Sequence, residues 1–553
     1  MTAEQGPTQW ALTAVHDVVA EAAPDRDMVI CGSVRRSFGE VRDRSRGLAS
    51  FLVGAGLGVR RERADLEPWE SGQDMVALVL HNSAEYLEAM LGVMRARAVP
   101  FNVNHHYRPG EVGDLLVYVG TSGIVYHRRY APLLAKALGE AGIQPSSLVL
   151  VHVEDGTDEA PLPGSTSYDD AVAVPVGDLP EPSPDDLYAV CTGGTTGRPK
   201  AVLWRQADIY VAGMAGSSVA TTDSITEAVL ANPANPWFAM PPLMHAASQW
   251  TAFAGFINGS PVLLHDDSGA FDARAVLEAI ERDRAHMMSM VGDAHGRPLV
   301  EEMRRRSYDL SSLKMVGTGG AITTEPVKQA LIELLPDILI MDGYGSSEVG
   351  SMAFGPRTAA GGASSFQPGA GATVVSADLS RELEAGDDEV GWMARGGAVP
   401  LGYLGDRVKT EATFPLVAGQ RMAVPGDRAR RLADGTLELL GRDSMVVNTG
   451  GEKVFVEEVE STLLEHPGIT DALVVGRASE RFGQEVVAVV SLRPGTRLEP
   501  SEVRSFVADR IARFKAPRAV LVCDQVRRHA NGKADYRWAL SVADEAVEAT
   551  GAG

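Results

Sequence analysis

The chain has 553 residues and a formal net charge of −22, with 45% hydrophobic and 22% charged residues. This length suffices for several domains, and the composition is that of a globular protein. The acidic balance excludes a globally basic, nucleic-acid-binding surface, so any anionic ligand must meet cations that are placed locally. The three cysteines are far apart in the sequence. They form neither a disulfide framework nor a zinc-binding pattern, which favours a reducing, cytoplasmic location.

The sequence shows no membrane-targeting feature. Its N-terminal residues contain no basic segment followed by an apolar core, so we expect no signal peptide. We find no run of about 18 apolar residues, so we expect no transmembrane helix.

The first two thirds of the chain alternate between helical and strand patterns. Buried strands are predicted at Met28 to Cys31, Met75 to Leu80, Ala98 to Val103, Gly123 to Tyr126, Leu148 to Val153, Trp237 to Met240, Pro261 to Leu264, Met287 to Met290, Lys314 to Thr318 and Ile338 to Asp342. Strands that alternate with helices predict an α/β fold with layered αβα sheets.

The pattern changes from about residue 365, where short β-like runs rich in Gly and Asp predict a small barrel-like subdomain. We therefore predict an N-terminal domain over residues 1–442 and a small, mobile α+β domain over residues 443–553. The second domain is expected to contain an amphipathic helix with Ser501 as its N-cap. One face of that helix would carry Val503, Phe506, Val507, Ile511 and Phe514.

A loop rich in glycine and threonine lies between two apolar runs, Tyr188 to Val190 and Ala201 to Trp204. It contains Thr192, Gly193, Gly194, Thr195, Thr196 and Gly197, and Lys200 follows. Glycines let backbone N–H groups approach a ligand, and hydroxyls add donors, so the loop is suited to phosphate oxygens. It is not a Walker loop, because Arg198 and Pro199 separate Gly197 from Lys200. Taken alone, it could also be an ordinary hairpin turn.

Two further loops follow predicted strands, at Gly317 to Ile322 and at Asp342 to Glu348. Ligands of α/β sheets bind at the carboxyl ends of strands, so we expect these loops beside the same ligand.

Seven segments, in this order, resemble the motifs of the adenylate-forming ligases, the superfamily of acyl-CoA synthetases, luciferases and peptide-synthetase adenylation domains. They are T-G-G-T-T-G-R-P-K (192–200), G-G-A (319–321), D-G-Y-G-S-S-E (342–348), P-G-D (425–427), G-R-D-S (441–444), G-G-E-K (450–453) and N-G-K (531–533). Segments 204–206, 242–250, 291–294 and 448–453 look most like actinobacterial fatty-acid or sterol-side-chain CoA ligases.

This resemblance implies a two-step reaction with ATP, Mg2+ and coenzyme A. The substrate carboxylate attacks the α-phosphate of ATP, and the CoA thiol then displaces AMP from the acyl carbon. The first step joins two anions and so needs cations and oriented donors. By resemblance, Lys533 contacts the α-phosphate and the carboxylate, while Thr192 and Glu348 hold Mg2+. The remaining nucleotide-binding residues would be Gly319, Gly320, Ala321, Asp342, Gly343, Tyr344, Gly345, Ser346, Ser347, Asp427 and Arg442.

The resemblance also assigns an acyl pocket and a route for CoA. His245 would gate the pocket and orient the carboxylate, and the lining residues would be Trp250, Met290, Val291 and Gly292. Gly450 and Gly451 would line the pantetheine tunnel, because glycines let a slender chain pass close to the backbone. Ser444 occupies the hinge position, where the family more often has Asp or Lys.

Several of these residues also have a purely structural interpretation. Lys533 could be a surface charge, Glu348 a helix cap, and His245 a core side chain. Asp427 could be a turn residue, Arg442 a salt-bridge partner, and Tyr344 a core residue.

Alternatives also remain for the function. The enzyme could be an acyl-AMP ligase that loads a carrier protein, or the chain could be a catalytically silent adenylate-binding homologue. The predicted partners are a small hydrophobic carboxylic acid, a fatty acid or sterol-side-chain acid, with ATP and CoA, and a homodimer is possible.

Overall fold

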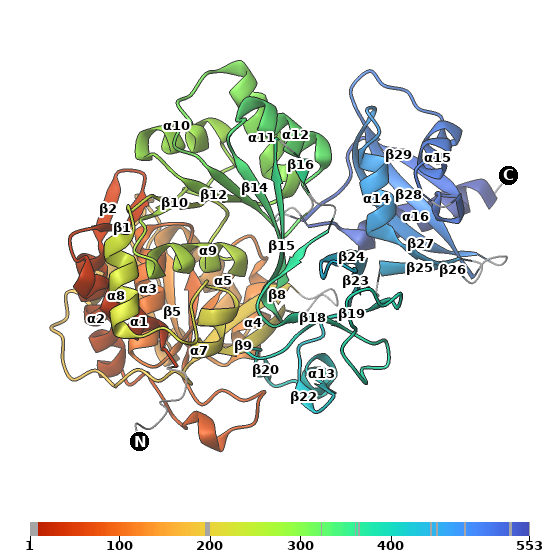
Figure 1. Cartoon of the computed structure of the whole chain (residues 1–553). Coiled ribbons are helices and arrows are strands. Elements are labelled where there is room, and N and C mark those ends of the chain that lie inside the picture. Colours follow the sequence, from red (N-terminus) through yellow and green to blue (C-terminus); the bar gives the residue numbers. More distant parts are fainter. Residues whose placement is uncertain are drawn as a thin grey trace.

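The computed structural model describes residues 9–193, 199–321, 323–359, 361–362, 365–442, 445–449, 452–479, 483–511, 513–529 and 533–551. A ten-stranded sheet crosses the large N-terminal part of the chain (Figure 1). Its strand order is β16-β15-β14-β13-β12-β10-β11-β1-β2, with β17 beside β15. The strands are β1 (Asp27–Cys31), β2 (Val34–Ser37), β10 (Trp237–Ala239), β11 (Val262–Leu264), β12 (Met287–Met290), β13 (Met315–Thr318), β14 (Leu339–Ser346), β15 (Gly350–Thr358), β16 (Gly361–Gly362) and β17 (Gln367–Pro368).

A second, five-stranded sheet is parallel throughout, in the order β4-β3-β5-β6-β7. Its strands are β3 (Met75–Val79), β4 (Val99–Asn102), β5 (Thr121–His127), β6 (Val149–Val153) and β7 (Thr166–Ser167). Val76 and Leu78 contribute to one hydrophobic cluster, whereas Ala77 and Val79 contribute to another. Both faces of this sheet are therefore covered, which explains why its strands read as continuous apolar runs.

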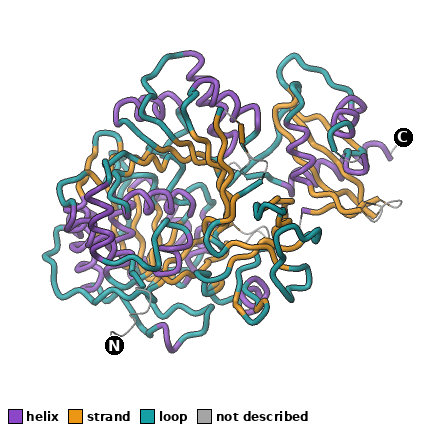
Figure 2. Tube along the Cα trace, in the orientation of Figure 1, coloured by secondary structure: helices purple, strands orange, loops and turns teal. Residues whose placement is uncertain are grey.

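Helices fill the space between the two sheets and cover their outer faces (Figures 1 and 2). The largest apolar cluster joins residues of both sheets to the intervening helices α1 (Leu12–Ala22), α2 (Phe38–Gly54), α3 (Ala84–Arg95), α8 (Thr222–Ala231) and α9 (Ala246–Ile257). Helices α4 (Pro109–Val119) and α5 (Ala131–Glu140) cover the five-stranded sheet. Helices α10 (Ala273–Asp283), α11 (Gly292–Arg305) and α12 (Glu325–Leu334) cover the ten-stranded sheet. The predicted layered α/β fold is confirmed.

Two smaller antiparallel sheets lie beside these layers. One has the order β20-β9-β8 and contains β8 (Leu187–Gly193), β9 (Pro199–Arg205) and β20 (Gly402–Tyr403). The other has the order β18-β19-β23-β24 and contains β18 (Ala372–Val375), β19 (Gly391–Arg395), β23 (Asp427–Arg431) and β24 (Leu437–Arg442). Short helix α13 (Arg407–Thr413) follows β20. This β-rich region corresponds to the subdomain expected from about residue 365.

The C-terminal part has its own sheet, β26-β25-β28-β27 with β29 beside β28, and lies to one side of the rest (Figure 1). Its elements are β25 (Val446–Thr449), β26 (Glu452–Phe455), α14 (Val456–Leu464), β27 (Ile469–Ser479), β28 (Gly483–Leu492), α15 (Pro500–Ala508), β29 (Ala519–Cys523) and α16 (Tyr536–Gly551). Separate apolar clusters lie on the two faces of this sheet.

The predicted cap of helix α15 is wrong. The helix begins at Pro500, and Glu499 is its N-cap in a capping box with Glu502. Proline is favoured at the first helical position because it has no N–H to leave unpaired and its φ is already helical. The helix also ends at Ala508, so Ile511 and Phe514 lie beyond it.

Strand β24 and helix α14 meet where the C-terminal part adjoins the rest. Gly441 has a φ of +97°, and a Cβ added there would lie 1.8 Å from Oε2 of Glu457. Glu457 therefore occupies the space that a side chain at position 441 would need.

None of the described helices is long and apolar enough to cross a membrane.

Candidate active site

The glycine- and threonine-rich loop connects the two antiparallel strands β8 and β9. Thr192 and Lys200 are register partners in this hairpin, so they lie opposite each other where the loop begins and ends. A plain hairpin and a phosphate loop share this backbone, so the pairing alone does not separate the two interpretations. Gly193 is the last residue of β8, whereas Gly194, Thr195, Thr196 and Gly197 lie outside the described residues.

Tyr403 connects Lys200 to Glu348. It lies on β20, opposite Val202 of β9, and is almost fully buried. Its hydroxyl donates a hydrogen bond of 2.9 Å to Oε1 of Glu348, and the Nζ atom of Lys200 lies 5.5 Å from its ring centroid. Lys200 also lies 4.0 Å from a carboxylate oxygen of Asp406. Sequence reasoning did not single out Tyr403, because its partners Lys200 and Glu348 come from two distant segments.

Glu348 lies in the turn between β14 and β15, and strand β15 follows it two residues later. Since no helix begins there, the interpretation of Glu348 as a helix cap is wrong. The turn is held by hydrogen bonds from Nε1 of Trp204 to the Ser347 carbonyl (2.9 Å), from the Glu348 N–H to Oγ of Ser346 (3.3 Å) and from the Val349 N–H to the Ser346 carbonyl (3.1 Å). The Glu348 carboxylate is therefore presented from a fixed backbone.

Two segments expected to bind the nucleotide, Gly319 to Ala321 and Asp342 to Ser347, approach each other closely. A Cβ at Gly319 would lie 3.1 Å from the Gly343 carbonyl oxygen, and Gly320 has a φ of +74°, so glycine suits both positions. Asp342, Gly343, Tyr344, Gly345 and Ser346 belong to strand β14 and not to the loop that was predicted. The strand continues because its residues pair with β15 in an antiparallel hairpin. Ala321 follows Gly320 at the end of the segment.

The side chain of Asp342 is engaged within the protein. It accepts hydrogen bonds from the Thr318 hydroxyl and from the Nζ atom of Lys328 on α12. These contacts join strands β13 and β14 to helix α12, so the Asp342 carboxylate stabilises the backbone of the segments expected to bind the nucleotide.

Asp427 and Arg442, two of the expected nucleotide-binding residues, are neighbours. They are register partners at the ends of β23 and β24, and Asp427 is buried. Asp427 therefore belongs to a strand, and the turn interpretation is wrong for it.

His245 belongs to the large N-terminal part and Lys533 to the C-terminal part, and the charge of Lys533 acts on His245. His245 is the N-cap residue of α9, and its Nε2 atom is buried without a hydrogen-bond partner among the described residues. Burial lowers its pKa to about 4, and the charge of Lys533 is the next largest cause. The imidazole is therefore neutral at physiological pH, and the Lys533 ammonium is close enough to disfavour its protonation.

Two buried asparagines position the segment before His245, and neither was singled out from the sequence. Asn82 accepts a hydrogen bond from the Leu243 N–H (2.7 Å) and donates one to the Pro241 carbonyl (3.3 Å). The side-chain amide of Asn102 donates to the carbonyls of Cys191 (2.8 Å) and Met244 (2.6 Å). Its oxygen accepts from the Cys191 N–H (2.9 Å). Asn102 thus ties the start of the phosphate loop to the residue before His245.

A group of buried histidines lies at the carboxyl ends of the parallel strands β3, β4 and β5. His81 and His127 stack with ring centroids 3.5 Å apart, and His105 stacks on Tyr130 at 5.0 Å. Burial lowers the pKa of His105 to about 3 and that of His127 to about 2. The positions of these residues just after predicted strands were a signal that could have found them.

Three of the proposed acyl-pocket residues, Met290 to Gly292, are consecutive at the end of β12 and the start of α11, whereas Trp250 lies apart from them on α9. Val291 faces the nucleotide segment, because its Cγ1 lies 3.7 Å from the position of a Cβ on Gly320. Gly292 begins helix α11, and Met290 is buried at the end of β12. Trp250 is buried in the main core, where its ring packs against Gly213. Hinge residue Ser444 and the tunnel glycines Gly450 and Gly451 lie outside the described residues.

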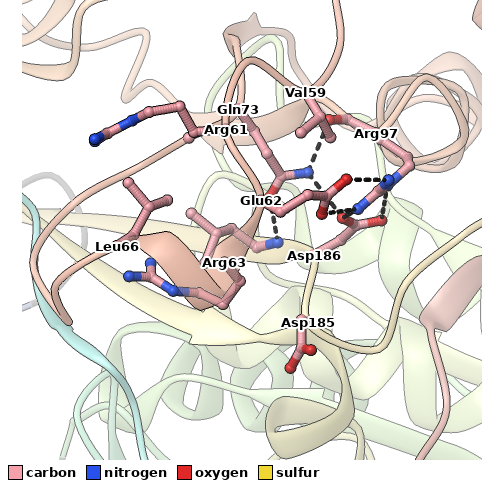
Figure 3. Close-up of a pocket in the computed structure, with 11 residues that line it drawn as sticks. Val59, Arg61, Glu62, Arg63, Leu66, Gln73, Arg97, Asp185 and Asp186 are labelled. Atoms are coloured by element: carbon pink, nitrogen blue, oxygen red, sulfur yellow. Dashed lines mark hydrogen bonds and ion pairs between the residues drawn. The ribbon is translucent and has the colours of Figure 1, made fainter.

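A pocket behind the β8 strand has a structural role (Figure 3). Its volume is about 10 Å³, which is room for about one water. Arg97 forms ion pairs of 2.9 Å with both Glu62 and Asp186, and Gln73 accepts a hydrogen bond from the Leu187 N–H (2.7 Å). These contacts fix the start of β8, from which the phosphate loop extends.

Comparisons with known proteins define the class. The model of the AMP-binding enzyme family matches residues 17–404, and that of the AMP-binding enzyme C-terminal domain matches residues 458–533. The chain belongs to this family. It is 42% identical, over 96% of its length and 98% of the relative's, to the medium-chain acyl-CoA ligase Mig of Mycobacterium avium.

A second relative, from Mycobacterium tuberculosis, is a medium/long-chain-fatty-acid–CoA/3-oxocholest-4-en-26-oate–CoA ligase. It is 37% identical over 94% of this chain and 93% of its own. The anthranilate CoA ligase AuaEII, solved with anthranoyl-AMP, has the same fold, with a TM-score of 0.78 at 19% identity over 99% and 100% of the two chains. The resemblance to actinobacterial fatty-acid and sterol-side-chain CoA ligases is confirmed.

Proposed function

We propose that this protein is an ATP-dependent, AMP-forming acyl-CoA ligase. It converts a hydrophobic carboxylic acid into its CoA thioester through an acyl-AMP intermediate. The observation that carries the proposal is the cluster at the phosphate end, where the buried Tyr403 hydroxyl donates to Glu348 and the Nζ atom of Lys200 lies 5.5 Å from the Tyr403 ring. Family membership supports the same reaction class.

In the first half-reaction, a carboxylate oxygen bonds to the α-phosphorus of ATP and pyrophosphate leaves. Lys533 stabilises the charge that develops between the carboxylate and the α-phosphate. Lys200 and the loop amides hold the β- and γ-phosphates. No proton transfer is needed, because the nucleophile is already an anion.

Magnesium fits the oxygen donors at the phosphate end. In the described part of the chain, no group of three or more His, Cys, Asp or Glu side chains could hold an ion by itself. Mg2+ suits such a site, because it keeps several waters and binds substrate phosphates. Thr192 and Glu348 would hold it, and it would neutralise charge on the phosphates.

His245 serves the acyl end of the site. Its neutral imidazole offers one donor and one acceptor, so it can orient the carboxylate without adding a second buried charge. Met290, Val291 and Gly292 are uncharged and lie on the side of the nucleotide segment, and they would line the start of the acyl chain's path.

In the second half-reaction the CoA thiol attacks the acyl carbon and AMP leaves. The small C-terminal domain, residues 443–553, would rotate about Ser444, which withdraws Lys533 and brings Gly450 and Gly451 to the pantetheine path. A Gly451→Leu variant should release pyrophosphate normally and form little CoA ester. An unchanged thioester yield would contradict this role.

The substrates of the relatives suggest the class of acid. One is named for medium-chain acyl groups, and the other for medium- and long-chain fatty acids and for 3-oxocholest-4-en-26-oate. We propose the same range for this enzyme, together with a cytoplasmic location. Formation of a homodimer stays a prediction, which sedimentation of the purified protein would test.

The decisive experiment supplies the purified protein with ATP, Mg2+ and CoA and a panel of acids: octanoate, palmitate, 3-oxocholest-4-en-26-oate, acetate and an amino acid. We expect AMP, pyrophosphate and a CoA ester with the apolar acids, and strong turnover of acetate or the amino acid would overturn the substrate class. Pyrophosphate release with no CoA ester would favour an acyl-AMP ligase that loads a carrier protein. Absence of pyrophosphate with every acid would favour a silent adenylate-binding homologue.

A further inference from the structure

A second lysine lies beside Lys200 at the phosphate end of the site. The Nζ atom of Lys409, on α13, is 5.6 Å from the ring centroid of Tyr403, and that of Lys200 is 5.5 Å from the same centroid. The same tyrosine donates its hydroxyl hydrogen to Glu348. One buried ring thus gathers two ammonium groups and the carboxylate expected to bind magnesium.

The position of Lys409 is fixed by the fold. Tyr403 and Gly402 pair with Val202 and Leu203 of β9, so β20 is attached to the strand that begins beside the phosphate loop. The Tyr403 N–H donates to Oγ1 of Thr410 (2.9 Å), which holds helix α13 against β20. A Cβ at Gly402 would lie 2.5 Å from the Thr410 methyl group, so this contact is close.

The two lysines share their surroundings with the carboxylates of Asp406 and Glu348. Asp406 lies 4.0 Å from Nζ of Lys200, and its other oxygen accepts a hydrogen bond from the Lys409 N–H (2.9 Å). Burial lowers the pKa of Lys200, and the nearby charge of Lys409 lowers it further. Two ammonium groups that repel each other are stabilised when a polyanion binds between or beside them.

We propose that Lys409 is a second phosphate-binding residue, which contacts the β- and γ-phosphates of ATP and the departing pyrophosphate together with Lys200. This inference depends on the proposed function, because it concerns the leaving group of the same reaction. The exposed Lys409 side chain lies near Lys200 but comes from the β-rich region, so pyrophosphate is bound by cations on two separate segments. AMP carries no β-phosphate and is not a ligand of Lys409.

The test compares binding of pyrophosphate and of AMP, each with Mg2+, to the full-length protein by calorimetry. Lys409→Gln should weaken pyrophosphate about tenfold and AMP less than about twofold, since a hydrogen bond to a charged group is lost only with pyrophosphate. Lys409→Arg should restore most of the affinity. Arg407→Gln is the matched control, because Arg407 is on the same helix but bonds to Glu411 (2.8 Å) and packs on Trp69.

Unchanged pyrophosphate affinity in Lys409→Gln would overturn the proposal. An equal loss for pyrophosphate and AMP would also overturn it, because it would mean that Lys409 only supports the fold around Tyr403. The KM for ATP in pyrophosphate exchange should rise with the same variant, while CoA-ester formation from supplied acyl-AMP stays at the wild-type rate. If the wild-type protein forms no acyl-AMP, the proposed function fails separately, and the pyrophosphate titration still decides the role of Lys409.

Discussion

The two ends of the candidate site differ in how they carry charge. At the phosphate end, Lys200, Lys409, Asp406 and Glu348 surround Tyr403, and the two lysines keep some contact with solvent. At the acyl end, His245 and the histidines behind it are buried, and their lowered pKa values keep them neutral.

This difference shows which part of the fold controls each end. The phosphate end is built from segments of the large N-terminal part alone. At the acyl end, the charge with the largest effect on the pKa of His245 is that of Lys533, which belongs to the C-terminal part. A movement of the C-terminal part would therefore change the charge at the acyl end and leave the phosphate end intact.

Replacing Lys533 should have the largest effect, because it removes the ammonium group that acts at the acyl end, where the buried histidines are neutral. In Lys533→Ala we expect acyl-adenylate formation to fall by a few hundredfold or more, equivalent to ~3–4 kcal/mol. Acyl transfer from supplied acyl-AMP should survive. Single-turnover assays of each half-reaction measure this, with Lys515→Ala as a control in the same domain, since Lys515 pairs with Glu458 (2.6 Å). Equal loss in both half-reactions would contradict the assigned role.

Asn102→Ala should disturb both ends at once. It leaves the Cys191 N–H and two carbonyls without their partner, which costs about 2–4 kcal/mol of unfolding free energy. Urea denaturation gives this value, and adenylation should slow as well. Asn104→Ala, in the loop that follows β4, is the control and should change stability by less than about 1 kcal/mol. Equal stability of the two variants would show that Asn102 does not join the ends.

Protonation of His245 at the acyl end should lower the free energy of unfolding in acid. The folded-state pKa of His245 lies below its unfolded value, so the unfolded chain binds the proton more tightly and stability falls as pH drops from about 6.5 to about 4. The loss from His245 is about 1–3 kcal/mol at pH 4. Denaturation at a series of pH values should show a shallower acid decline for His245→Asn than for wild type. Parallel curves would mean that His245 is not buried in its neutral form.

Tyr403→Phe should have the smallest effect. It keeps the ring beside both lysines and removes the hydrogen bond to Glu348, worth about 1 kcal/mol at a partly solvated site. We expect the KM for ATP to rise about fivefold, with the acid KM unchanged. Steady-state assays with each substrate varied separately test this, and an equal rise in both KM values would argue against a role confined to the phosphate end.

The sequence was sufficient for the layered fold, because the central strands of both large sheets are apolar runs bounded by polar loops. Glu348, Lys200, Asp427 and Lys533 could be named from motifs whose chemistry is local. Tyr403, Asn102 and Lys409 could not, since each matters through contacts with segments more than fifty residues away in the chain. The N-cap of α15 was misplaced because Ser501 follows a proline that already begins the helix.

Residues Asp342 to Ser346 were expected in a loop but belong to strand β14. Glycines at 343 and 345 favoured a loop, but pairing with β15 satisfies the backbone along the whole segment. Local composition was overridden by a hairpin partner that follows directly in the chain.

The contact between Gly441 and Glu457 has a consequence for engineering. A methyl group at position 441 would collide with the Glu457 carboxylate, and a non-glycine residue would be strained at a φ of +97°. The arrangement of the two parts described here therefore tolerates only the smallest residue at that point. Gly441→Ala, made alone and together with Glu457→Ala, would separate the cost of the backbone strain from the cost of the collision.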